Sequence, residues 1–468
     1  MATLVKPLEN TSTLVTKEKK VSNNTWLKEW SPEDTSFWEA TGKTIAWRTL
    51  TVTTFALTLS FASWFMMSAI VTRLNGIGFA FTGQQLFWLA AMPGLAAGTL
   101  RIIHTFLIPI YGTRHTITIA TLLKLIPVIG IGLAVMNPGT PFWVFMVLAL
   151  TAGFGGGDFS SFMPSTNLFF PARLKGTALG IQAGIGNFGV SIAQFMTPVM
   201  LGVALYGAPQ VFSKSAGDTG ETLVQQIYLQ SAAFWYVPLL IITAIVCWFL
   251  LKSVPVKASF REQLDIFREK HTWYCTITYF MTFGTFAGLS AAFPMMIHTI
   301  YGKFEAAPDP LKYAFYGPLI GSASRILFGF IADKVGGAIL TTITGIGLMA
   351  GVALIIGMDL VNPSGMEQFP WFIAITMMLF FFTGIGNAST FRQFPIIFKE
   401  NPRQAAGVIG WTAAIAAYGP FVFSMAIAAF MGGTGSATGF FWILGIYLLV
   451  ATWINWYFYQ RKGAERPS

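Results

Sequence analysis

Charged residues are scarce in this sequence: Asp, Glu, Lys and Arg make up 10% of its 468 residues, whereas hydrophobic residues make up 54%. A soluble globular domain carries about a quarter charged residues. The shortage therefore argues against a soluble domain and favours an integral membrane protein. Residues that bind metals are also few. The four His and two Cys form no cluster and no nucleophile motif is present, so we expect no metal, no cofactor and no enzyme.

The sequence is instead rich in long apolar runs. About 20 apolar residues cross a bilayer as a helix, and the sequence contains twelve such runs. Residues 1–43 precede them without an apolar core followed by a cleavage site, so the first run is expected to act as the insertion signal. The predicted spans are 46–72, 84–110, 115–136, 142–170, 176–206, 229–252, 272–301, 311–332, 338–359, 369–398, 404–431 and 437–460.

The net charge of +10 comes from short loops between these runs, which argues against a nucleic-acid partner. With the N-terminus inside, only four basic residues (Arg73, Lys214, Lys303, Lys312) lie in outside loops. Four more (Arg101, Lys124, Arg325, Arg392) lie within spans, and the remaining 21 of 29 are inside. The positive-inside rule therefore predicts that both termini are cytoplasmic.

The runs divide into two sets of six. We predict a cytoplasmic segment 1–43, a first bundle 44–252, a charged linker 253–270, a second bundle 271–460 and a tail 461–468. The linker is expected to form a short amphipathic helix with Phe260, Leu264 and Phe267 on one face.

The two halves share an internal repeat at an offset of 224 residues. The segment from Pro93 through Arg101 to Phe106 aligns with the segment from Gly317 through Arg325 to Phe330, and Gly112 aligns with Gly336. Two six-helix halves related by an axis normal to the membrane are the organisation of the major facilitator fold. Asp333–Gly337 resembles the cytoplasmic loop signature of that superfamily. The predicted fold is therefore all-α, with twelve transmembrane helices in two pseudo-symmetric bundles.

Arg101 and Arg325 lie deep in spans 2 and 8. A charged side chain at mid-membrane costs at least about 2.5–3.5 kcal/mol, and about 10–14 Å of helix separates each arginine from its cytoplasmic end. That depth disfavours snorkelling to the interface. Spans 2 and 8 contain no mid-span acid that would neutralise either arginine. Because guanidinium groups bind oxyanions in a bidentate manner, the pair predicts a path for a small anion.

Asp158 is the only acid deep inside the twelve spans, since Asp359 is the last residue of span 9, and two interpretations remain open. It could form an ion pair with Arg392 of span 10, or it could carry a proton, since burial raises a carboxyl pKa toward neutrality. His104, one turn from Arg101, could line the path or have a packing role. Lys124 and His298 are expected near the membrane interface.

Small and aromatic residues complete the set of candidates. Gly176, Gly180 and Gly184 form a small-xxx-small ridge on span 5 that predicts close helix packing. Asn187 follows on the same span, where a buried amide needs a reason to be present. Tyr279 and Phe283 share one face of span 7, although such a pair alone more often belongs to the core than to a site.

Nearly the whole chain resembles the nitrate/nitrite porter family of the major facilitator superfamily. The resemblance begins with Trp30–Asp34 and Phe37-Trp38 and includes Leu100-Arg101 and Pro109–Gly112. Its most specific part is the nitrate signature Gly176–Gly189 on span 5. Tyr279–Gly284 and Ser324-Arg325 match as well.

The resemblance implies a role for each matching residue. Arg101 and Arg325 would bind the nitrate oxygens, Phe159 and Phe283 would sandwich the flat anion, and Asn187 and Tyr279 would donate hydrogen bonds. The second signature, 407–419, has fewer glycines than the family pattern. Exchangers of the family carry Asn where this chain has Asp158, and Gln where it has Arg392.

These departures favour a proton-coupled nitrate importer. The alternatives are a nitrate/nitrite antiporter and a porter for another small inorganic anion. The expected partners are nitrate, possibly nitrite, protons and the lipid bilayer. The expected location is a bacterial cytoplasmic membrane, and the expected functional state is a monomer. A passive channel is disfavoured by the repeat, and a receptor is disfavoured by the absence of a sensory domain in the sequence.

Overall fold

The computed structural model describes residues 25–105, 107–216, 221–255 and 261–468, and this part is built mainly of helices. In the first half the elements are α1 (Thr35–Phe37), η1 (Trp38–Gly42), α2 (Lys43–Ile70), η2 (Val71–Arg73), η3 (Asn75–Ile77), α3 (Gly83–His104), α4 (Leu107–Leu123), α5 (Leu125–Val135), α6 (Phe142–Ala152), α7 (Phe154–Gly157), α8 (Phe159–Phe169), α9 (Ala172–Met200), β1 (Gln210–Ala216), β2 (Glu221–Ile227), α10 (Ser231–Phe234) and α11 (Tyr236–Leu250).

A 3₁₀ segment, η5 (Arg261–Arg268), joins this half to the second. The second half consists of α12 (Lys270–Tyr279), η6 (Phe280–Gly284), α13 (Thr285–Met296), η7 (Ile297–Tyr301), η8 (Pro310–Lys312), α14 (Tyr316–Val335), α15 (Gly337–Gly357), η9 (Met366–Gln368), α16 (Phe369–Ile397), α17 (Pro402–Ala416), α18 (Gly419–Thr434), α19 (Thr438–Asn455) and η10 (Trp456–Gln460).

Among the described residues, eleven helical segments are long and apolar enough to cross a membrane. The twelfth predicted span corresponds to α9, which has 29 residues but carries the buried amides of Gln182, Asn187 and Gln194. Those amides and several glycines lower its hydropathy. Helix α9 packs against α2 of its own half and α14 of the other half, so it occupies the interior position that a polar span requires. The prediction of twelve spans is confirmed.

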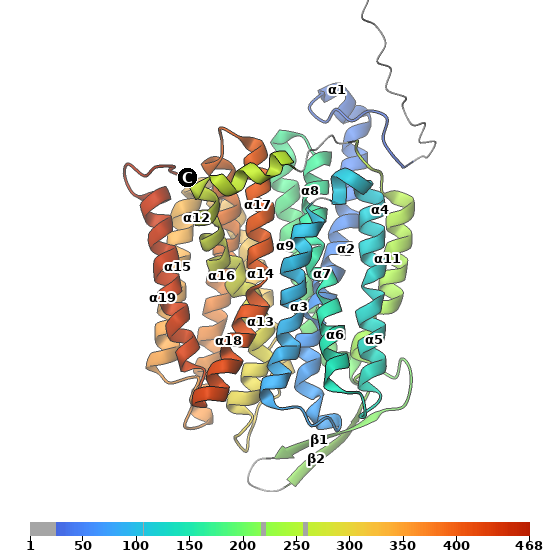
Figure 1. Ribbon diagram of the computed structural model, residues 1–468, viewed down its shortest axis with the longest axis vertical. Coiled ribbons are helices and arrows are strands. Elements are labelled where there is room, and N and C mark those ends of the chain that lie inside the picture. Colours follow the sequence, from blue (N-terminus) through green and yellow to red (C-terminus); the bar gives the residue numbers. More distant parts are fainter. Residues whose placement is uncertain (1–24, 106, 217–220, 256–260) are drawn as a thin grey trace, which may run out of the picture.

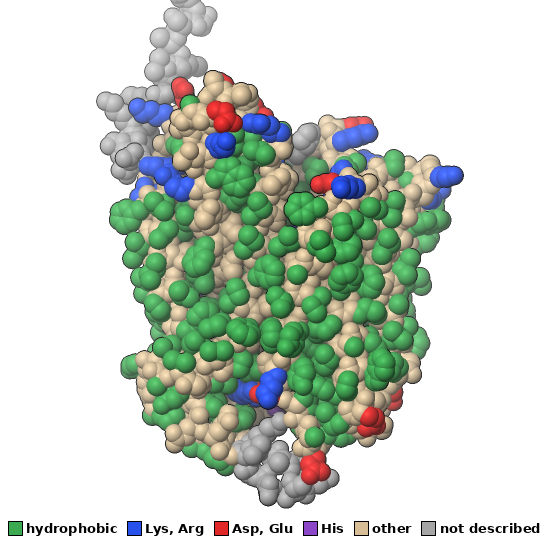
Figure 2. All heavy atoms as spheres, turned by 180° about the vertical axis from the view of Figure 1, so that it is seen from behind, with side chains coloured by type: hydrophobic (Ala, Val, Ile, Leu, Met, Phe, Trp, Pro, Cys, Tyr) green, Lys and Arg blue, Asp and Glu red, His purple; other side chains and the backbone are tan. Residues whose placement is uncertain are grey.

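The two halves stand side by side, with the blue-to-green helices next to the yellow-to-red ones (Figure 1). The C-terminus and α1 lie at one end of the bundle, here called the terminal side. The β1–β2 hairpin lies at the opposite end, the hairpin side. Lys and Arg side chains gather at the terminal side, and hydrophobic side chains cover the belt below them (Figure 2). The charge asymmetry seen in the sequence is thus an asymmetry between the two ends of the bundle.

The repeat extends to backbone geometry. Gly112 and Gly336, which are 224 residues apart, both have positive φ angles, of 74° and 99°. Each lies where span 2 or span 8 turns into the next helix. A residue with a Cβ rarely adopts this conformation, so the two glycines allow the same turn in each half. Arg101 on α3 and Arg325 on α14 precede these turns by the same number of residues.

The hairpin was not predicted. Its strands pair antiparallel from Gln210 opposite Ile227 to Ala216 opposite Glu221. The ring of Phe212 packs on Gly76, where a Cβ would collide with it, and it lies 5.2 Å from the guanidinium carbon of Arg73. The hairpin therefore covers the loop that follows α2.

The linker helix agrees with its prediction only in part. Phe267 packs edge-on against Trp411 of α17, with ring centroids 4.7 Å apart, whereas Leu264 is 43% exposed. Phe260 lies outside the described residues. Ile266, which is buried, provides the inward contact together with Phe267.

Several helices break near the middle of the bundle. Helix α3 ends at His104, and a short helical stretch from Leu107 leads to Gly112, where the backbone leaves the helical conformation. Span 4 is divided at Gly153 and again at Asp158. Span 7 contains a π-helical turn, η6. Breaks and π-turns within helices are common at functional sites because they free backbone groups and redirect side chains.

Candidate functional site

Arg101 is fully buried between the two halves. Its Nε donates to the Gly156 carbonyl at 2.8 Å, and one Nη donates to the Ala413 carbonyl of α17 at 2.6 Å. The other, Nη2, has no hydrogen-bond partner among the described residues. The glycine run before Asp158 makes this reach possible, since a Cβ at Gly156 would lie 2.7 Å from the Trp64 ring. Arg101 therefore joins the halves and keeps one donor unused.

Aromatic rings surround the Arg101 guanidinium. Its central carbon lies 4.8 Å from the Phe159 ring centroid and 5.3 Å from that of Phe283. Trp64 and Phe61 lie at 5.5 and 6.0 Å. Ring faces carry partial negative charge and attract a buried cation. These rings therefore help to stabilise the buried guanidinium.

Arg325 is 6% exposed and lies on α14. Its guanidinium carbon is 5.0 Å from the Phe391 ring centroid. With the Asn187 amide oxygen turned toward it, that oxygen accepts a 2.8 Å hydrogen bond from Arg325 Nη1, and the amide nitrogen donates to the Ala183 carbonyl at 3.3 Å. Asn187 of the first half therefore holds the arginine of the second half.

The aromatic candidates come together around both arginines. Tyr279 and Phe283 stack with ring centroids 5.6 Å apart and an interplanar angle of 5°. The Tyr279 hydroxyl is within electrostatic reach of both guanidinium groups and within hydrogen-bonding reach of that of Arg325. Phe391, which sequence reasoning missed, lies 5.2 Å from Tyr279 and 6.3 Å from Phe159. Its position next to Arg392 in the sequence gave no signal, because phenylalanine is common throughout the spans.

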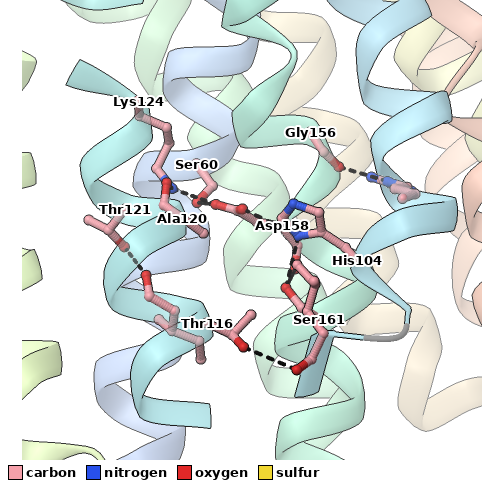
Figure 3. A network of polar contacts seen from close by, with 12 residues as sticks. Ser60, His104, Thr116, Ala120, Thr121, Lys124, Gly156, Asp158 and Ser161 are labelled. Carbon is pink, nitrogen blue, oxygen red and sulfur yellow. Dashed lines mark hydrogen bonds and ion pairs between the residues drawn. The ribbon is translucent and has the colours of Figure 1, made fainter. Parts of the chain in front are cut away.

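Asp158 lies in a network of polar contacts beside Arg101 (Figure 3). Its Oδ2 forms an ion pair with Lys124 and accepts a hydrogen bond from the Ser60 hydroxyl at 2.6 Å. Its Oδ1 faces His104 Nδ1 at 3.8 Å. Asp158 and Lys124 are both 0% exposed. The prediction that Lys124 lies at the membrane interface is therefore wrong, because the C-terminal end of α4 turns this side chain toward span 4.

The predicted pairing of Asp158 with Arg392 is also wrong. Arg392 Nε donates to Asp333 at the end of α14, at 2.7 Å, and about a third of the Arg392 side chain is exposed. Arg392 thus lies at the terminal side, where it contacts Asp333, the first residue of the loop signature in its own half. We no longer consider it a candidate for proton coupling.

Residues 49–398 match the Major Facilitator Superfamily. The chain is 54% identical to the probable nitrate/nitrite antiporter NarK2 of Thermus thermophilus over 96% of its own length and 99% of that protein. It is 35% identical to the nitrate/nitrite transporter NarU of Escherichia coli over 93% of its length and 96% of that protein. The chain belongs to the nitrate/nitrite porter family of the major facilitator superfamily.

A solved structure agrees with the fold of this porter. A bacterial homologue of the human lysosomal transporter Spinster, in an inward-facing and unoccupied conformation, superposes with a TM-score of 0.60 at 15% identity. The match covers 88% of this porter and 96% of that chain. At this identity the likeness shows the shared fold alone.

Hydrogen bonds join the halves of the porter toward the hairpin side. Arg73 forms an ion pair with Asp309 at 2.5 Å. Ser191 donates to the Phe315 carbonyl at 3.0 Å, and Gln194 donates to the Ser290 carbonyl at 2.8 Å. Nearer the arginines, Thr99 and Tyr418 share a hydrogen bond of 2.9 Å. The hairpin side of the porter is therefore closed.

The predicted glycine ridge is packed at one of its three positions. A Cβ on Gly184 would lie 2.7 Å from Ile326 of α14, so the helices touch there. Gly176 and Gly180 are exposed, and a Cβ on either would meet no atom within 4 Å. The ridge prediction is wrong for these two positions because α9 and α14 move apart toward the terminal side.

One apolar groove lies away from these residues. It has a volume of about 620 Å³ and is lined by apolar side chains of α5, α9 and α11 near the hairpin side, including Ile129, Leu133 and Met200. None of the predicted site residues lines it. The arginine pair is thus a buried site between the halves and not part of an open groove.

Proposed function

We propose that the protein is a secondary active transporter that imports nitrate by proton symport with alternating access. The observation that carries this proposal is the pair of buried arginines, Arg101 and Arg325. They come from equivalent positions of the two halves and face common aromatic residues. Arg101 Nη2 is a buried donor with no protein partner among the described residues, as a donor reserved for an anion would be.

Nitrate fits this set of residues. It is planar, monovalent and weakly hydrated, so guanidinium edges and flat aromatic walls suit it better than they suit a strongly hydrated ion. In this proposal Arg101 and Arg325 bind the oxygens, Phe159 and Phe283 flank the plane, and Tyr279 donates a hydrogen bond. Asn187 either donates to the anion or, as its contact with Arg325 supports, holds that guanidinium in place.

Membrane orientation follows from charge. Lys and Arg side chains gather at the terminal side (Figure 2), and positive charge is retained on the cytoplasmic side of bacterial membranes. We therefore place the terminal side in the cytoplasm, with both termini there, and the hairpin outside. A monomer suffices, because the two halves of one chain supply both arginines.

The buried network around Asp158 supports proton coupling. An importer driven by protons must return without its anion, and a group that changes charge makes that return possible. An exchanger with two fixed positive charges changes conformation only with an anion bound, so it has no need of such a group. The Asp158 network includes His104 of α3, the helix that carries Arg101, and Asp158 directly precedes Phe159.

Nitrate/nitrite exchange is the second candidate. The relative from Thermus thermophilus, at 54% identity, is named a probable nitrate/nitrite antiporter. In that case the Lys124–Asp158 ion pair would have a structural role only.

Transport by the purified protein in sealed vesicles separates the two functions. We expect nitrate accumulation when the outside is acidic and the inside holds neither nitrate nor nitrite, and collapse of the proton gradient should stop it. If nitrate enters only when nitrite is trapped inside, and a proton gradient has no effect, the protein is an exchanger. Competition with nitrite, chlorate and chloride defines the selectivity.

A further inference from the structure

The polar network beside Arg101 contains two groups able to exchange a proton, Asp158 and His104. Proton symport, on which this inference rests, requires one of them to gain a proton on one side of the membrane and lose it on the other. Their contacts and burial are different. The comparison of the two decides which group is suited to the task.

Asp158 is already neutralised. Its Oδ2 is bound by Lys124 and by the Ser60 hydroxyl, and Lys124 is further held by the Ala120 carbonyl at 2.9 Å. Removing one charge of a buried pair leaves the other without compensation, which typically costs 3–5 kcal/mol. Protonation of Asp158 would leave the fully buried Lys124 ammonium without a compensating negative charge. Asp158 therefore serves better as a fixed negative charge than as a carrier.

His104 has the properties that Asp158 lacks. It is 9% exposed, whereas Asp158 and Lys124 are 0% exposed, so the imidazole is the less enclosed of the ionisable groups. His104 Nδ1 lies 3.1 Å from the Ser161 hydroxyl and 3.8 Å from Asp158 Oδ1. That carboxylate oxygen has no hydrogen-bond partner among the described residues. An imidazolium at His104 would find a ready acceptor after a small movement.

The charges around His104 link its proton to the anion. The charged groups that face it are Asp158 from the α7–α8 junction, Lys124 from the end of α4 and Arg101 from its own helix. Ser60 of α2 and Ser161 of α8 contribute hydroxyls only. Two cations against one anion oppose a further positive charge. An anion bound at Arg101, one helical turn away, removes that opposition.

We propose that His104 takes up and releases the co-transported proton, and that the Lys124–Asp158 ion pair is its fixed counter-ion. A proton from the outside solution binds an imidazole nitrogen when nitrate binds Arg101 and Arg325. Both leave to the cytoplasm, and the neutral imidazole returns.

Linkage gives this proposal a measurable form. If nitrate and one proton bind together, each raises the affinity for the other by the same factor. Nitrate affinity should then fall up to about tenfold per pH unit as pH rises above the range in which His104 titrates. The wild-type protein in detergent, titrated with sodium nitrate from pH 5 to 9, should show this dependence.

The deciding variant is His104→Gln, with His115→Gln as its matched control. His115 is a partly buried histidine at the terminal side, packed against Trp248, and it lies outside the network. We expect His104→Gln to lose proton-driven nitrate accumulation by at least about 20-fold, to keep nitrate/nitrate exchange within about threefold, and to bind nitrate independently of pH. His115→Gln should behave like wild type in all three measurements.

A double variant tests the same assignment while leaving His104 in place. In Asp158→Asn/Lys124→Met the buried charges are removed together. The pH dependence of nitrate binding should persist if His104 is the carrier, with its midpoint displaced because the counter-ion is gone. Loss of the pH dependence there, or gradient-driven accumulation by His104→Gln, would overturn the proposal. Wild-type protein that shows exchange but no proton-driven uptake would instead refute the symport function itself. The two failures are therefore distinguishable.

Discussion

The surroundings of the two arginines differ although the arginines occupy equivalent positions. In the first half, Arg101 is followed on the next turn by His104, and Lys124 lies on the next span. In the second half, the residue 224 positions after His104 is Phe328, and the residue 224 positions after Lys124 is Leu348. Phe328 packs in a small apolar cluster with Ala332, Leu340 and Ile385, and Leu348 is buried in the main core.

Neutral polar groups replace the charged network in the second half. Thr341 bonds to Ser389 at 2.7 Å and to Gln393 at 2.9 Å, and Gln393 donates to Asn455 at 3.0 Å. Such hydrogen bonds hold helices together without any group that titrates near neutral pH. In the proposed mechanism anion binding is shared by both halves, whereas the charged network beside the arginine belongs to the first half.

The largest expected effect concerns the buried ion pair of the first half. Asp158→Ala should lower the free energy of unfolding by about 3–5 kcal/mol, because Lys124 would remain as an unpaired buried charge. The double variant Asp158→Leu/Lys124→Met should recover most of that loss. Thermal unfolding in detergent measures both.

The exposed pair of the second half provides the control for that experiment. Asp333→Asn removes a largely exposed partner of Arg392 and should change stability by no more than about 1 kcal/mol. Equal losses for Asp158→Ala and Asp333→Asn would show that the halves do not differ in the way described.

Exchange of the arginines for lysine should remove most nitrate binding. We expect Arg101→Lys and Arg325→Lys each to weaken nitrate affinity about 100-fold or more, since an ammonium lacks the planar fork of donors. Arg101→Lys should also reduce thermal stability more than Arg325→Lys, because it loses the bonds to Gly156 and Ala413. Equilibrium titration with nitrate measures affinity, and Arg392→Lys is the control that should bind as wild type does.

The open face of α9 offers a further contrast within the first half. Gly180→Leu meets open space, so the protein should fold normally, yet transport should fall about tenfold or more if α9 and α14 close there during the cycle. Gly184→Leu, in contrast, collides with Ile326 and should lower the melting temperature. Unchanged nitrate uptake by Gly180→Leu would show that this face stays open throughout transport.

The smallest effect is expected at Phe391, the aromatic residue of the second half that lies over Arg325. Phe391→Leu keeps most of the volume but removes the ring face, which is worth about 0.5–2 kcal/mol to a nearby cation. Nitrate affinity should fall about 3- to 30-fold, with little change in stability. A larger loss in Phe159→Leu would indicate that the rings of the first half contribute more.

Much of the site was predictable because its signals are local in the chain. The spans follow from apolar runs, and the depth of Arg101 and Arg325 follows from their distance to the ends of those runs. The repeat located the two arginines in equivalent helices, and the signature containing Asn187 pointed to a polar role on α9. The structure brings Phe159, Phe283 and Tyr279 to the same place as these residues.

The partners of the buried charges were not predictable. Lys124 and Arg392 both lie within predicted spans, and the sequence alone gave no reason to pair Asp158 with the first and not the second. The choice depends on the rotation of each helix about its axis and on the packing of helices distant in the chain. Phe391 was missed for the same reason. The hairpin was missed because 207–228 carries no long apolar run, although Gly217-Asp-Thr-Gly220 is a turn signal.

By itself the sequence determined the membrane class, the number of spans, the charge asymmetry of the two ends and the identity of the two buried arginines. These are properties of composition and of spacing along one chain, and the insulating bilayer core leaves few ways to satisfy them. Tertiary structure alone decided that Asp158 pairs with Lys124, that His104 faces the free carboxylate oxygen, and that α9 and α14 separate toward the terminal side. Ion pairs and gates are formed between segments far apart in sequence, so only the packing of the helices fixes them.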